Sequence, residues 1–412
     1  MFKKALTLSA RALSIAALIA LAGCAGTQFM TGGAEATGGY RGGEVIAILL
    51  PQTGRYAGAA RAVRDGVLAA RDAAAPGAQP QIVFYDSSDP ASAPSLLQKA
   101  AANGASLVIG PLQKEAVTAL VASGPLPVPT LALNRAATEA APPANLFQFA
   151  LAPEDEAANV ARKAWAEGHR SALILYPDGR WGDRMAFGFR QEWLALGGQA
   201  AASEIYTPGA ADFSVPVTDL FARAGGAPGA DFLFMVATAT TARKLWPQVQ
   251  ASGGAGLNVF STSHVSGPGT GPDAGAPGLS GLYLVDIPWL LTPEPADPLS
   301  RERLQGKIAG IDQRYIRLYA MGIDAYGLAP RLSSMTRNPG FYMDGRTGRL
   351  SLDDKRRVRR ELVLARYQGP RPVPVAMLPA GTTTHGRAAP ANGDAFPLIA
   401  AAGTGAVVPA RP

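Results

Sequence analysis

The chain has 412 residues, of which 48% are hydrophobic and 17% are charged. This composition is typical of a packed globular protein and excludes a mainly disordered one. The formal charge of +7 falls by three to +4 if Lys3, Lys4 and Arg11 are removed with a leader. An excess of this size does not indicate a nucleic-acid partner. The single cysteine, Cys24, excludes an internal disulfide, so stability has to come from burial of a core.

The first 23 residues have the pattern of a bacterial lipoprotein signal peptide. A basic start is followed by the apolar run 12–20, and the small residues Ala22 and Gly23 precede Cys24. The apolar run is shorter than the roughly 20 residues that a membrane-spanning helix needs. We therefore expect residues 1–23 to be removed and the thiol of Cys24 to carry a lipid that anchors the chain to a membrane. The alternative is a core cysteine behind an ordinary export signal.

Two segments outside the central body have compositions that do not form a core. Residues 24–43 are rich in Gly and Thr, which predicts a flexible tether after the lipidated cysteine. The part of it after Cys24 would span about 60 to 70 Å when fully extended and roughly 25 Å as a flexible coil. Residues 376–412 are dominated by Ala, Pro, Gly and Thr and predict a disordered tail.

The body, residues 44–375, alternates apolar strands with amphipathic helices. The run 45–50 is continuously apolar and predicts a strand buried on both faces. Val63, Val67 and Leu68 follow it at helical spacing. Further strands are predicted at 82–85, 107–109, 128–133, 172–176 and 232–236, and further helices at 96–102, 116–121, 154–167 and 185–196. This alternation predicts an α/β fold with parallel sheets covered by helices on both faces.

The alternation falls into two series that are separated near residues 150–153. The second series opens with Glu154, Asp155 and Glu156 in the first turn of a helix, where negative charges favour the positive end of the helix dipole. One stripe of the helix 185–196 is apolar, and we expect it to face the core. Two series of this size predict two doubly wound lobes. Ligands of such sheets bind beyond the carboxyl ends of the strands, which would place a cleft between the lobes.

The body contains no pattern that indicates catalysis. The histidines His169, His264 and His385 are far apart in the sequence, and none has a neighbouring ligand at metal spacing. No Gly-x-Ser-x-Gly string is present, and the glycine-rich stretch 267–281 contains three prolines, which favours a surface loop over a phosphate-binding turn. We therefore expect no metal site, no cofactor and no enzymatic activity.

The clearest basic run covers residues 355–360. Asp353, Asp354 and Glu361 lie directly beside it. Mixed charges of this kind favour a solvated helix or hairpin face over a docking patch.

Several strings of the body resemble known proteins. The first strand and its turn, residues 49–58, resemble the first βα unit of type I periplasmic binding proteins. Other strings resemble, more narrowly, the binding-protein-like domain of the LpoA-like activators of class A penicillin-binding proteins; they are residues 85–88, 109–114, 131–134, 149–157, 182–184, 191–198, 318–325 and 344–350. The resemblance spans nearly all of residues 44–375, and it rests on the order and spacing of the strings.

This resemblance implies a fold, a function and a location. The fold is two doubly wound lobes joined by a hinge, with lobe 1 at about 44–150 and 263–330 and lobe 2 at about 151–262 and 331–375. The implied function is non-enzymatic: binding and activation of a class A penicillin-binding protein in peptidoglycan synthesis. Ala25 follows the cysteine at a position where aspartate is associated with retention in the inner membrane, so the implied location is the outer membrane. Because only the short predicted tether separates Cys24 from this fold, we expect the chain to be without the long helical domain that precedes the fold in long family members.

A lipid-anchored solute-binding protein of an ABC transporter, for amino acids or related small molecules, is the alternative. In that case Thr53, Asn134 and Trp181 are the candidate cleft-lining residues. Amino-acid-binding members of the superfamily hold their ligand with small hydroxyl residues after the third and fourth strands, whereas residues 112–114 and 134–135 read Leu-Gln-Lys and Asn-Arg. This departure weakens the alternative, because a buried zwitterion needs polar partners.

Overall fold

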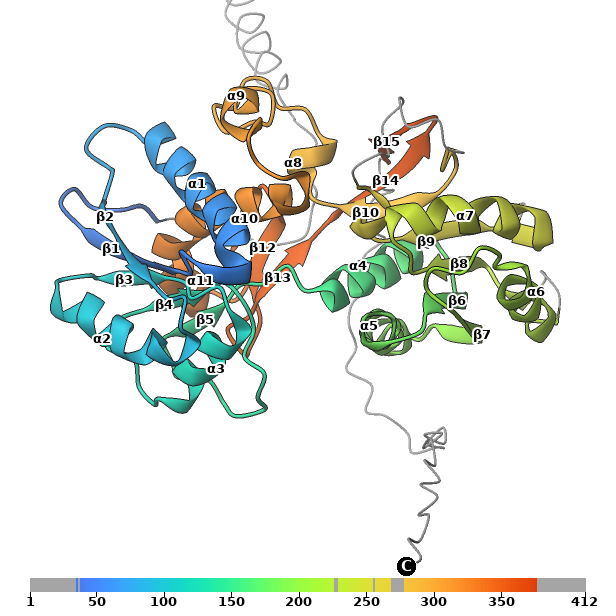
Figure 1. The fold of residues 1–412 in the computed structure, drawn as a ribbon, viewed down its shortest axis with the longest axis horizontal. Helices are drawn as coiled ribbons and strands as arrows, with labels where there is room; N and C mark the ends of the chain where they lie inside the picture. Colours follow the sequence, from blue (N-terminus) through green and yellow to red (C-terminus); the bar gives the residue numbers. More distant parts are fainter. Residues whose placement is uncertain (1–34, 36–37, 226–228, 255, 268–277, 376–412) are drawn as a thin grey trace, which may run out of the picture. The chain divides into compact units, whose positions relative to one another are not determined.

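The computed structural model describes residue 35 and residues 38–225, 229–254, 256–267 and 278–375 (Figure 1). The predicted signal peptide, Cys24 and the predicted tail 376–412 lie outside the described residues. In the described part of the chain, no helix is long and apolar enough to cross a membrane.

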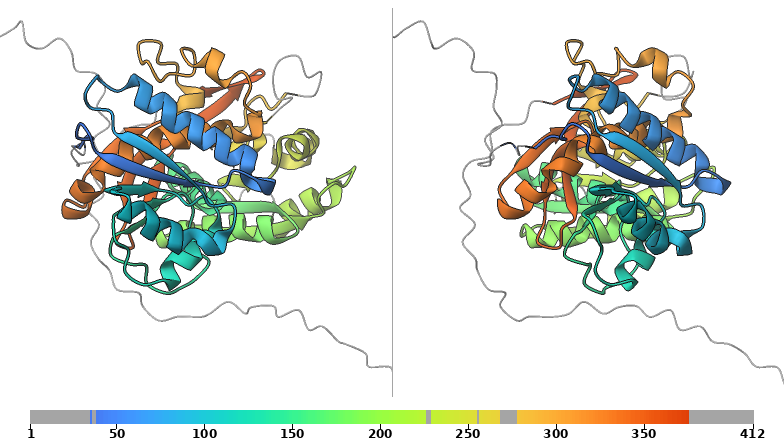
Figure 2. Two further views of the ribbon diagram at one scale, coloured as in Figure 1. Left: turned by 60° about the vertical axis from the view of Figure 1, so that its left-hand side comes forward. Right: turned by 90° about the vertical axis from the view of Figure 1, so that its left-hand side faces the viewer.

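The first lobe is built on a parallel sheet of five strands in the order β2-β1-β3-β4-β5. Its strands are β1 (Val45–Leu50), β2 (Gln81–Asp86), β3 (Leu107–Ile109), β4 (Thr130–Ala132) and β5 (Leu146–Gln148), and its first helices are α1 (Ala57–Ala73), α2 (Ala93–Ala102) and α3 (Lys114–Ala122). Side chains of β1 alternate between two cores: Ile46 and Ile48 share one with α1, while Ala47 and Leu49 share the other with α2 and α3. The helices therefore cover both faces of the sheet, as the buried strand predicted (Figure 2).

The second lobe is built on a sheet of seven strands in the order β15-β14-β10-β9-β8-β6-β7. Its strands are β6 (Ser171–Pro177), β7 (Gln199–Tyr206), β8 (Phe232–Met235), β9 (Asn258–Ser261), β10 (Tyr283–Asp286), β14 (Val363–Gln368) and β15 (Arg371–Pro374), and its helices are α4 (Pro153–Ala166), α5 (Arg180–Ala195), α6 (Ser214–Arg223) and α7 (Ala239–Val249). The five strands β6 to β10 repeat the order of the first lobe, and β14 and β15 extend the sheet by antiparallel pairing. The predicted pair of doubly wound lobes is confirmed.

A third sheet and the remaining helices complete the described chain. They are the antiparallel strands β11 (Tyr342–Gly345), β12 (Gly348–Leu352) and β13 (Val358–Glu361), with helices α8 (Pro288–Leu291), α9 (Gln305–Ile308), α10 (Ile316–Leu328) and α11 (Leu332–Arg337). The chain passes between the lobes three times: from β5 to α4, after β10, and from β13 to β14.

These crossings correct the predicted lobe boundaries. Strand β10 lies in the second sheet, so residues 263–267 and 278–286 belong to lobe 2 and not to lobe 1. Residues 331–361 were expected in lobe 2, but their hairpin pairs with β5 of lobe 1, where the amide of Gln148 donates to the carbonyl of Arg356 at 3.1 Å. An apolar run such as 282–285 indicates a strand but not which sheet the strand joins, and the hairpin at 342–361 has no continuous apolar run.

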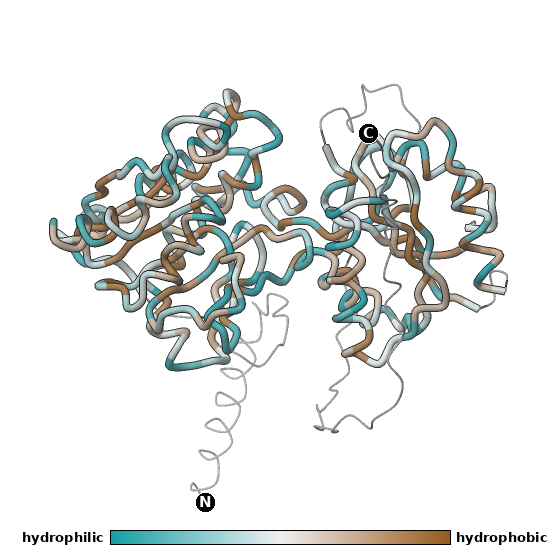
Figure 3. The backbone as a smooth tube through the Cα atoms, turned by 60° about the horizontal axis from the view of Figure 1, so that its bottom comes forward, coloured by the Kyte–Doolittle hydropathy of each residue, from teal (hydrophilic) through white to brown (hydrophobic). Residues whose placement is uncertain are grey.

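One hydrophobic core is continuous from the first lobe into the second. Phe147 and Phe149 lie in the same cluster as Val160 of α4 and Ile174 of β6, and all four are almost fully buried. The predicted apolar stripe of α5 also lies in this core, with Trp193 completely buried. Figure 3 shows the hydrophobic residues following the strands of both lobes.

Helices α1 and α10 cross at two glycines. A Cβ atom on Gly66 would lie 2.0 Å from the carbonyl oxygen of Tyr319, and a Cβ on Gly322 would lie 2.1 Å from that of Val63. Both distances are far inside van der Waals contact, so only glycine allows the two backbones to approach this closely. Helix α10 is thereby held on the first lobe.

The predicted tether is shorter than expected. Residues 38–43 are described, and the hydroxyl of Tyr40 donates to the carbonyl of Tyr326 at 2.8 Å while the two rings lie 4.7 Å apart. The ring of Tyr40 packs against the hydrophobic core. Any extended tether therefore ends before Tyr40, and not at residue 43.

The basic run at 355–360 forms a hairpin, which confirms one of the two expected forms. Arg356 occupies the turn with a positive φ of 55°, and Arg357 pairs with Asp353 at 2.8 Å. Arg360 departs from the solvated face, because it is only 2% exposed.

Candidate functional site

The three consecutive acids at the start of α4 each contact a different element. Glu154 accepts a hydrogen bond from Nη2 of Arg184 on α5 at 2.8 Å. Asp155 pairs at 2.6 Å with Arg135, which follows β4 in the first lobe. Glu156 points into the protein and is 4% exposed. The triplet, predicted to serve the helix dipole, also joins α4 to three neighbours at the point where the chain changes lobes.

Glu156 is the buried member of the triplet. Its Oε2 accepts from Oγ of Ser263 at 2.8 Å and from the amide of Ser263 at 3.2 Å, and it lies 3.5 Å from Nδ1 of His264. Burial alone raises the pKa of this carboxyl, but the hydrogen bond and charge of His264 and the charges of Arg360 and Arg317 outweigh it and lower the pKa to about 2. Glu156 is therefore ionised at neutral pH.

A second ion pair links the carboxyl end of β10 to α10. Arg317 donates from Nε to Oδ1 of Asp286 at 2.9 Å, and its Nη2 donates to the carbonyl of Ser263 at 3.4 Å. Asp286 is almost completely buried, whereas Arg317 keeps 23% of its side chain exposed. A two-point contact of this kind fixes the orientation of α10 against the second lobe.

Asn159, one turn further along α4, binds the segment that passes from β13 to β14. Its Nδ2 donates to the carbonyl of Arg360 at 2.9 Å, and its Oδ1 accepts from the amide of Leu362 at 3.0 Å. We call the set Glu156, Asn159, Ser263, Asp286, Arg317 and Arg360 the hinge cluster. It ties together all three segments that pass between the lobes.

The three candidate cleft residues each contact a different part of the chain. The hydroxyl of Thr53 donates to Oγ of Ser88 at 3.0 Å and fastens the turn after β1 to the turn after β2. Asn134 donates to the carbonyl of Leu112 at 3.0 Å. Trp181 packs against His264, with ring centroids 5.2 Å apart. Among the described residues, no hydrogen bond or ring contact joins Thr53, Asn134 and Trp181 to one another.

The polar side chains of the turns that would face a cleft each make a contact within the chain, although Oε1 of Gln113 and Nε of Arg135 have no hydrogen-bond partner among the described residues. Nε2 of Gln113 donates to the carbonyl of Ser88 at 3.4 Å, and Arg135 is held by Asp155. Asn134 is bonded at both ends, because its Oδ1 also accepts from the amide of Arg135 at 2.9 Å. Binding of an amino acid at these turns would have to break such contacts.

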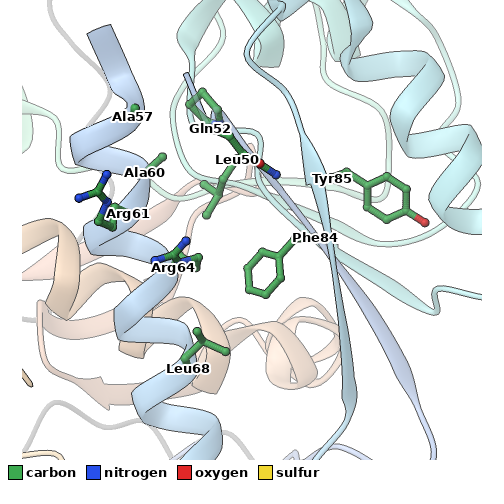
Figure 4. A pocket seen from close by; sticks show the side chains of 10 residues that line it. Leu50, Gln52, Ala57, Ala60, Arg61, Arg64, Leu68, Phe84 and Tyr85 are labelled. Carbon is green, nitrogen blue, oxygen red and sulfur yellow. The ribbon is translucent and has the colours of Figure 1, made fainter. Parts of the chain in front are cut away.

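A cavity of about 440 Å³ lies between α1, the turn after β1 and the edge strand β2. Figure 4 shows the ring of Phe84 facing Arg64 and Leu68 of α1, while Tyr85 points away. Arg61 is exposed and makes no ion pair in the described part of the chain, whereas Arg64 pairs with Asp65 at 3.0 Å. The cavity can accept an apolar group beside Phe84 and an anionic group beside Arg61.

Two of the strings that carried the resemblance meet at Asp324. This buried residue of α10 accepts hydrogen bonds from the amide of Arg346 at 2.6 Å and from the amide and hydroxyl of Thr347 at 2.7 and 2.5 Å. It thereby holds the β11–β12 turn on α10. Burial raises the pKa of Asp324 to about 6, although these hydrogen bonds act in the opposite direction.

Stability is therefore expected to depend on the protonation of Asp324. Its carboxyl binds a proton more tightly in the folded chain than in the unfolded one, so this group adds stability as pH falls from about 6 to about 4 and takes it away as pH rises. Chemical denaturation of the wild type and of Asp324→Asn at pH 7 and pH 4 measures the effect. The free energy of unfolding of the wild type, taken relative to that of the variant, should rise by about 2 to 3 kcal/mol when the pH is lowered from 7 to 4. An equal difference at both pH values would contradict the prediction.

The described residues contain no group of three or more His, Cys, Asp or Glu side chains that could hold a metal ion. What the geometry provides is two doubly wound lobes with a polar hinge cluster between them, which is the architecture of a type I periplasmic binding protein.

Comparison with known proteins places the chain more narrowly. Residues 43–369 match the family described as "LppC putative lipoprotein", and the chain belongs to this family. The penicillin-binding protein activator LpoA of Pantoea ananatis is 32% identical over 339 residues, which cover 74% of this chain and 49% of that protein. The chain thus spans about half the length of the curated relatives it matches.

Solved structures give the same result. The C-domain of LpoA from Haemophilus influenzae, described as a regulator of PBP1A, is similar with a TM-score of 0.67 and 26% identity, covering 81% of this chain and all of that domain. A proposed branched-chain amino acid ABC transporter protein of Chromobacterium violaceum is similar with a TM-score of 0.65 and 28% identity, covering 79% of this chain and all of that one. The predicted fold and family are confirmed.

Proposed function

We propose that this protein is a non-enzymatic lipoprotein that binds and activates a class A penicillin-binding protein and so regulates peptidoglycan synthesis. The observation that carries the proposal is the family relationship along residues 43–369, whose curated relatives are named as penicillin-binding protein activators. The structural likeness to a complete LpoA domain described as a regulator of PBP1A supports it. An activator of this kind acts by binding one conformation of the synthase more tightly than another.

The internal contacts of the two lobes favour this function over solute capture. Gln113, Asn134 and Arg135 in the turns after β3 and β4 each make a contact within the chain, so using them for a zwitterion would cost those contacts. The hinge cluster joins all three crossings through a buried carboxylate and a buried ion pair. Such a hinge suits a body that presents a fixed surface to a protein partner.

Attachment to the membrane is the second part of the proposal. Cys24 carries the lipid, and Ala25 after the cysteine favours the outer membrane as the location. Because the segment 38–43 is packed on α10, a tether to the lipid has fewer free residues than the sequence suggested. The short tether keeps the two lobes near the membrane, so the synthase has to extend toward them.

A small ligand between the lobes is the alternative function. The likeness to the Chromobacterium violaceum protein favours it, and Thr53, Asn134 and Trp181 are its proposed contacts. These three side chains would have to exchange their present partners for the ligand.

One experiment separates the two functions. The rate of glycan polymerisation by a purified class A synthase is measured with and without the full lipidated protein in detergent, and the thermal stability of the protein is measured against amino acids and muropeptides. We expect a faster polymerisation rate and no large stabilisation by an amino acid. An unchanged rate together with strong stabilisation by one amino acid would establish the solute-binding alternative instead.

A further inference from the structure

Strand β7 forms one edge of the second sheet. It pairs with β6 only, and the register shift between the two strands lies at its start, so residues 202–206 run regularly along the free edge. The carbonyl of Tyr206 accepts from the amide of Asp178 and so faces inward. Because successive residues of a strand alternate, the backbone groups of Ser203 and Ile205 face outward and are open to another strand.

Exposed hydrophobic side chains gather beside this edge. Six large hydrophobic residues are exposed in the described part of the chain, and four of them lie on β7 or on the two helices next to it. They are Phe187 and Leu194 on α5, at 62% and 56% exposure, Ile205 on β7 at 46%, and Val215 on α6 at 67%. A concentration of this kind marks an interaction surface, whereas single exposed residues do not.

The two helices flank the edge from opposite faces of the sheet. The core side chains of α5 pack with Ile174 of β6, while those of α6 pack with Leu173 and Leu175, which point the other way. Figure 1 shows α5 and α6 on either side of β7. A strand added to β7 would therefore lie between exposed side chains of α5 on one face and Val215 of α6 on the other.

The position of Phe187 relative to β7 follows from one hydrogen bond. Nη2 of Arg190 on α5 donates to Oγ of Ser203 at 2.8 Å, which aligns these two residues. Phe187 is about one turn before Arg190, and Ile205 is two residues beyond Ser203 on an element that runs in the opposite direction. Both side chains therefore lie on the same side of the contact, toward the carboxyl end of β7.

The surface on the α6 side is acidic. A hollow of about 210 Å³ there is lined by Glu204, Asp212 and Asp219 together with Ile205 and Val215, and by no basic residue. Glu204 is compensated by Arg223 at 2.9 Å. Asp219 is exposed one helical turn after Val215, and Asp212 precedes it, with a pKa lowered by hydrogen bonds from Ser214. Neither Asp212 nor Asp219 has an ion-pair partner among the described residues, and the two carboxylates flank an exposed apolar side chain.

We propose that the free edge of β7 binds an extended, basic segment of the penicillin-binding protein as an additional strand. The proposal rests on the proposed function, and it names the surface through which that function acts. The outward backbone groups of β7 would pair with the segment, its apolar side chains would pack on Phe187, Ile205 and Val215, and its Lys or Arg residues would lie near Asp212 and Asp219. A second copy of this chain is disfavoured, because it would bring the same carboxylates face to face.

Binding of the full lipidated protein to a purified class A synthase tests the proposal through two independent changes. The double variant Val215→Lys and Asp219→Lys should weaken binding by about tenfold or more, because it removes the apolar contact and reverses the charge. Ile205→Pro removes an outward amide, and it should weaken binding more than Ile205→Ala, which keeps that amide. Val373→Lys on the opposite edge strand β15, where the side chain is 38% exposed, is the matched control and should bind normally.

The outcomes distinguish the surface from the function. If the wild type activates the synthase and all variants bind equally well, the β7 proposal is wrong while the proposed function stands. If the wild type neither binds nor activates any class A synthase, the proposed function fails first. Sedimentation of the free protein adds a further check, since a dimer that Ile205→Pro disrupts would assign the edge to self-association. Melting temperatures of all variants within a few degrees of the wild type show that binding, and not folding, is being measured.

Discussion

The free energy of unfolding of the variant Glu156→Gln is expected to be about 3 kcal/mol lower than that of the wild type. Glutamine keeps an oxygen for Ser263 but removes the negative charge that faces Arg317 and Arg360. Arg360 depends most on this charge, because its side chain is buried and its Nε and Nη2 have no hydrogen-bond partner among the described residues. A buried cation that loses its carboxylate is a large energetic defect.

The neighbouring acid of the same helical turn provides the control. Glu154→Gln removes a negative charge from the same end of the helix dipole. Because Glu154 pairs with Arg184 at a solvent-exposed position, the free energy of unfolding should fall by less than about 1 kcal/mol. Denaturant titration of both variants measures the comparison. If both variants lost the same free energy of unfolding, Glu156 would stabilise the protein through the helix dipole and not through the hinge cluster.

The dependence of this effect on pH has a definite sign. The pKa of Glu156 is lowered on folding, so its contribution is present above the pKa of the unfolded chain and is lost as pH falls from about 4.5 toward 2. The stability difference between wild type and Glu156→Gln should therefore be full at pH 7 and shrink below pH 4. A difference that stays constant down to pH 3 would contradict this assignment.

Hydrophobic periodicity located the strands that are buried on both faces. Strands β1 and β3 lie where the apolar runs predicted them, because burial on both faces requires a continuous run. Strand β7 was missed, since its sequence QAAASEIY is rich in Ala and has neither a continuous run nor a clean alternation. An edge strand is half solvated, so its residues carry a weaker signal than those of a central strand.

The hinge cluster could be predicted only in part. The acids 154–156 were visible as a helix start, but their partners Arg135 and Ser263 come from other elements, and periodicity carries no information about which loops meet. The candidate residues Thr53 and Asn134 were chosen because they follow strands. The structure uses both to fasten turns, which is the commoner role of polar residues at such positions.

The variant Gly322→Ala tests how the first lobe holds the helix that carries part of the hinge cluster. In an exposed helix, alanine in place of glycine stabilises by up to about 1 kcal/mol. At Gly322 the new Cβ would lie 2.1 Å from the carbonyl oxygen of Val63, so α1 and α10 must separate. We expect the free energy of unfolding to fall by about 3 kcal/mol, the upper range for overpacking. Gly66→Ala, at the reciprocal contact, should behave alike.

A glycine in an open position provides the control, and Arg317 on α10 links Gly322 to the hinge cluster. Gly306→Ala in α9, where a Cβ would meet nothing within 4 Å, should be neutral or slightly stabilising, in contrast to the loss expected for Gly322→Ala. Arg317 lies on α10 less than two turns before Gly322, and displacement of the helix would strain its pairing with Asp286. Combining Gly322→Ala with Asp286→Asn should therefore cost less than the sum of the single losses. Strict additivity would show that the glycine crossing and the hinge cluster act independently.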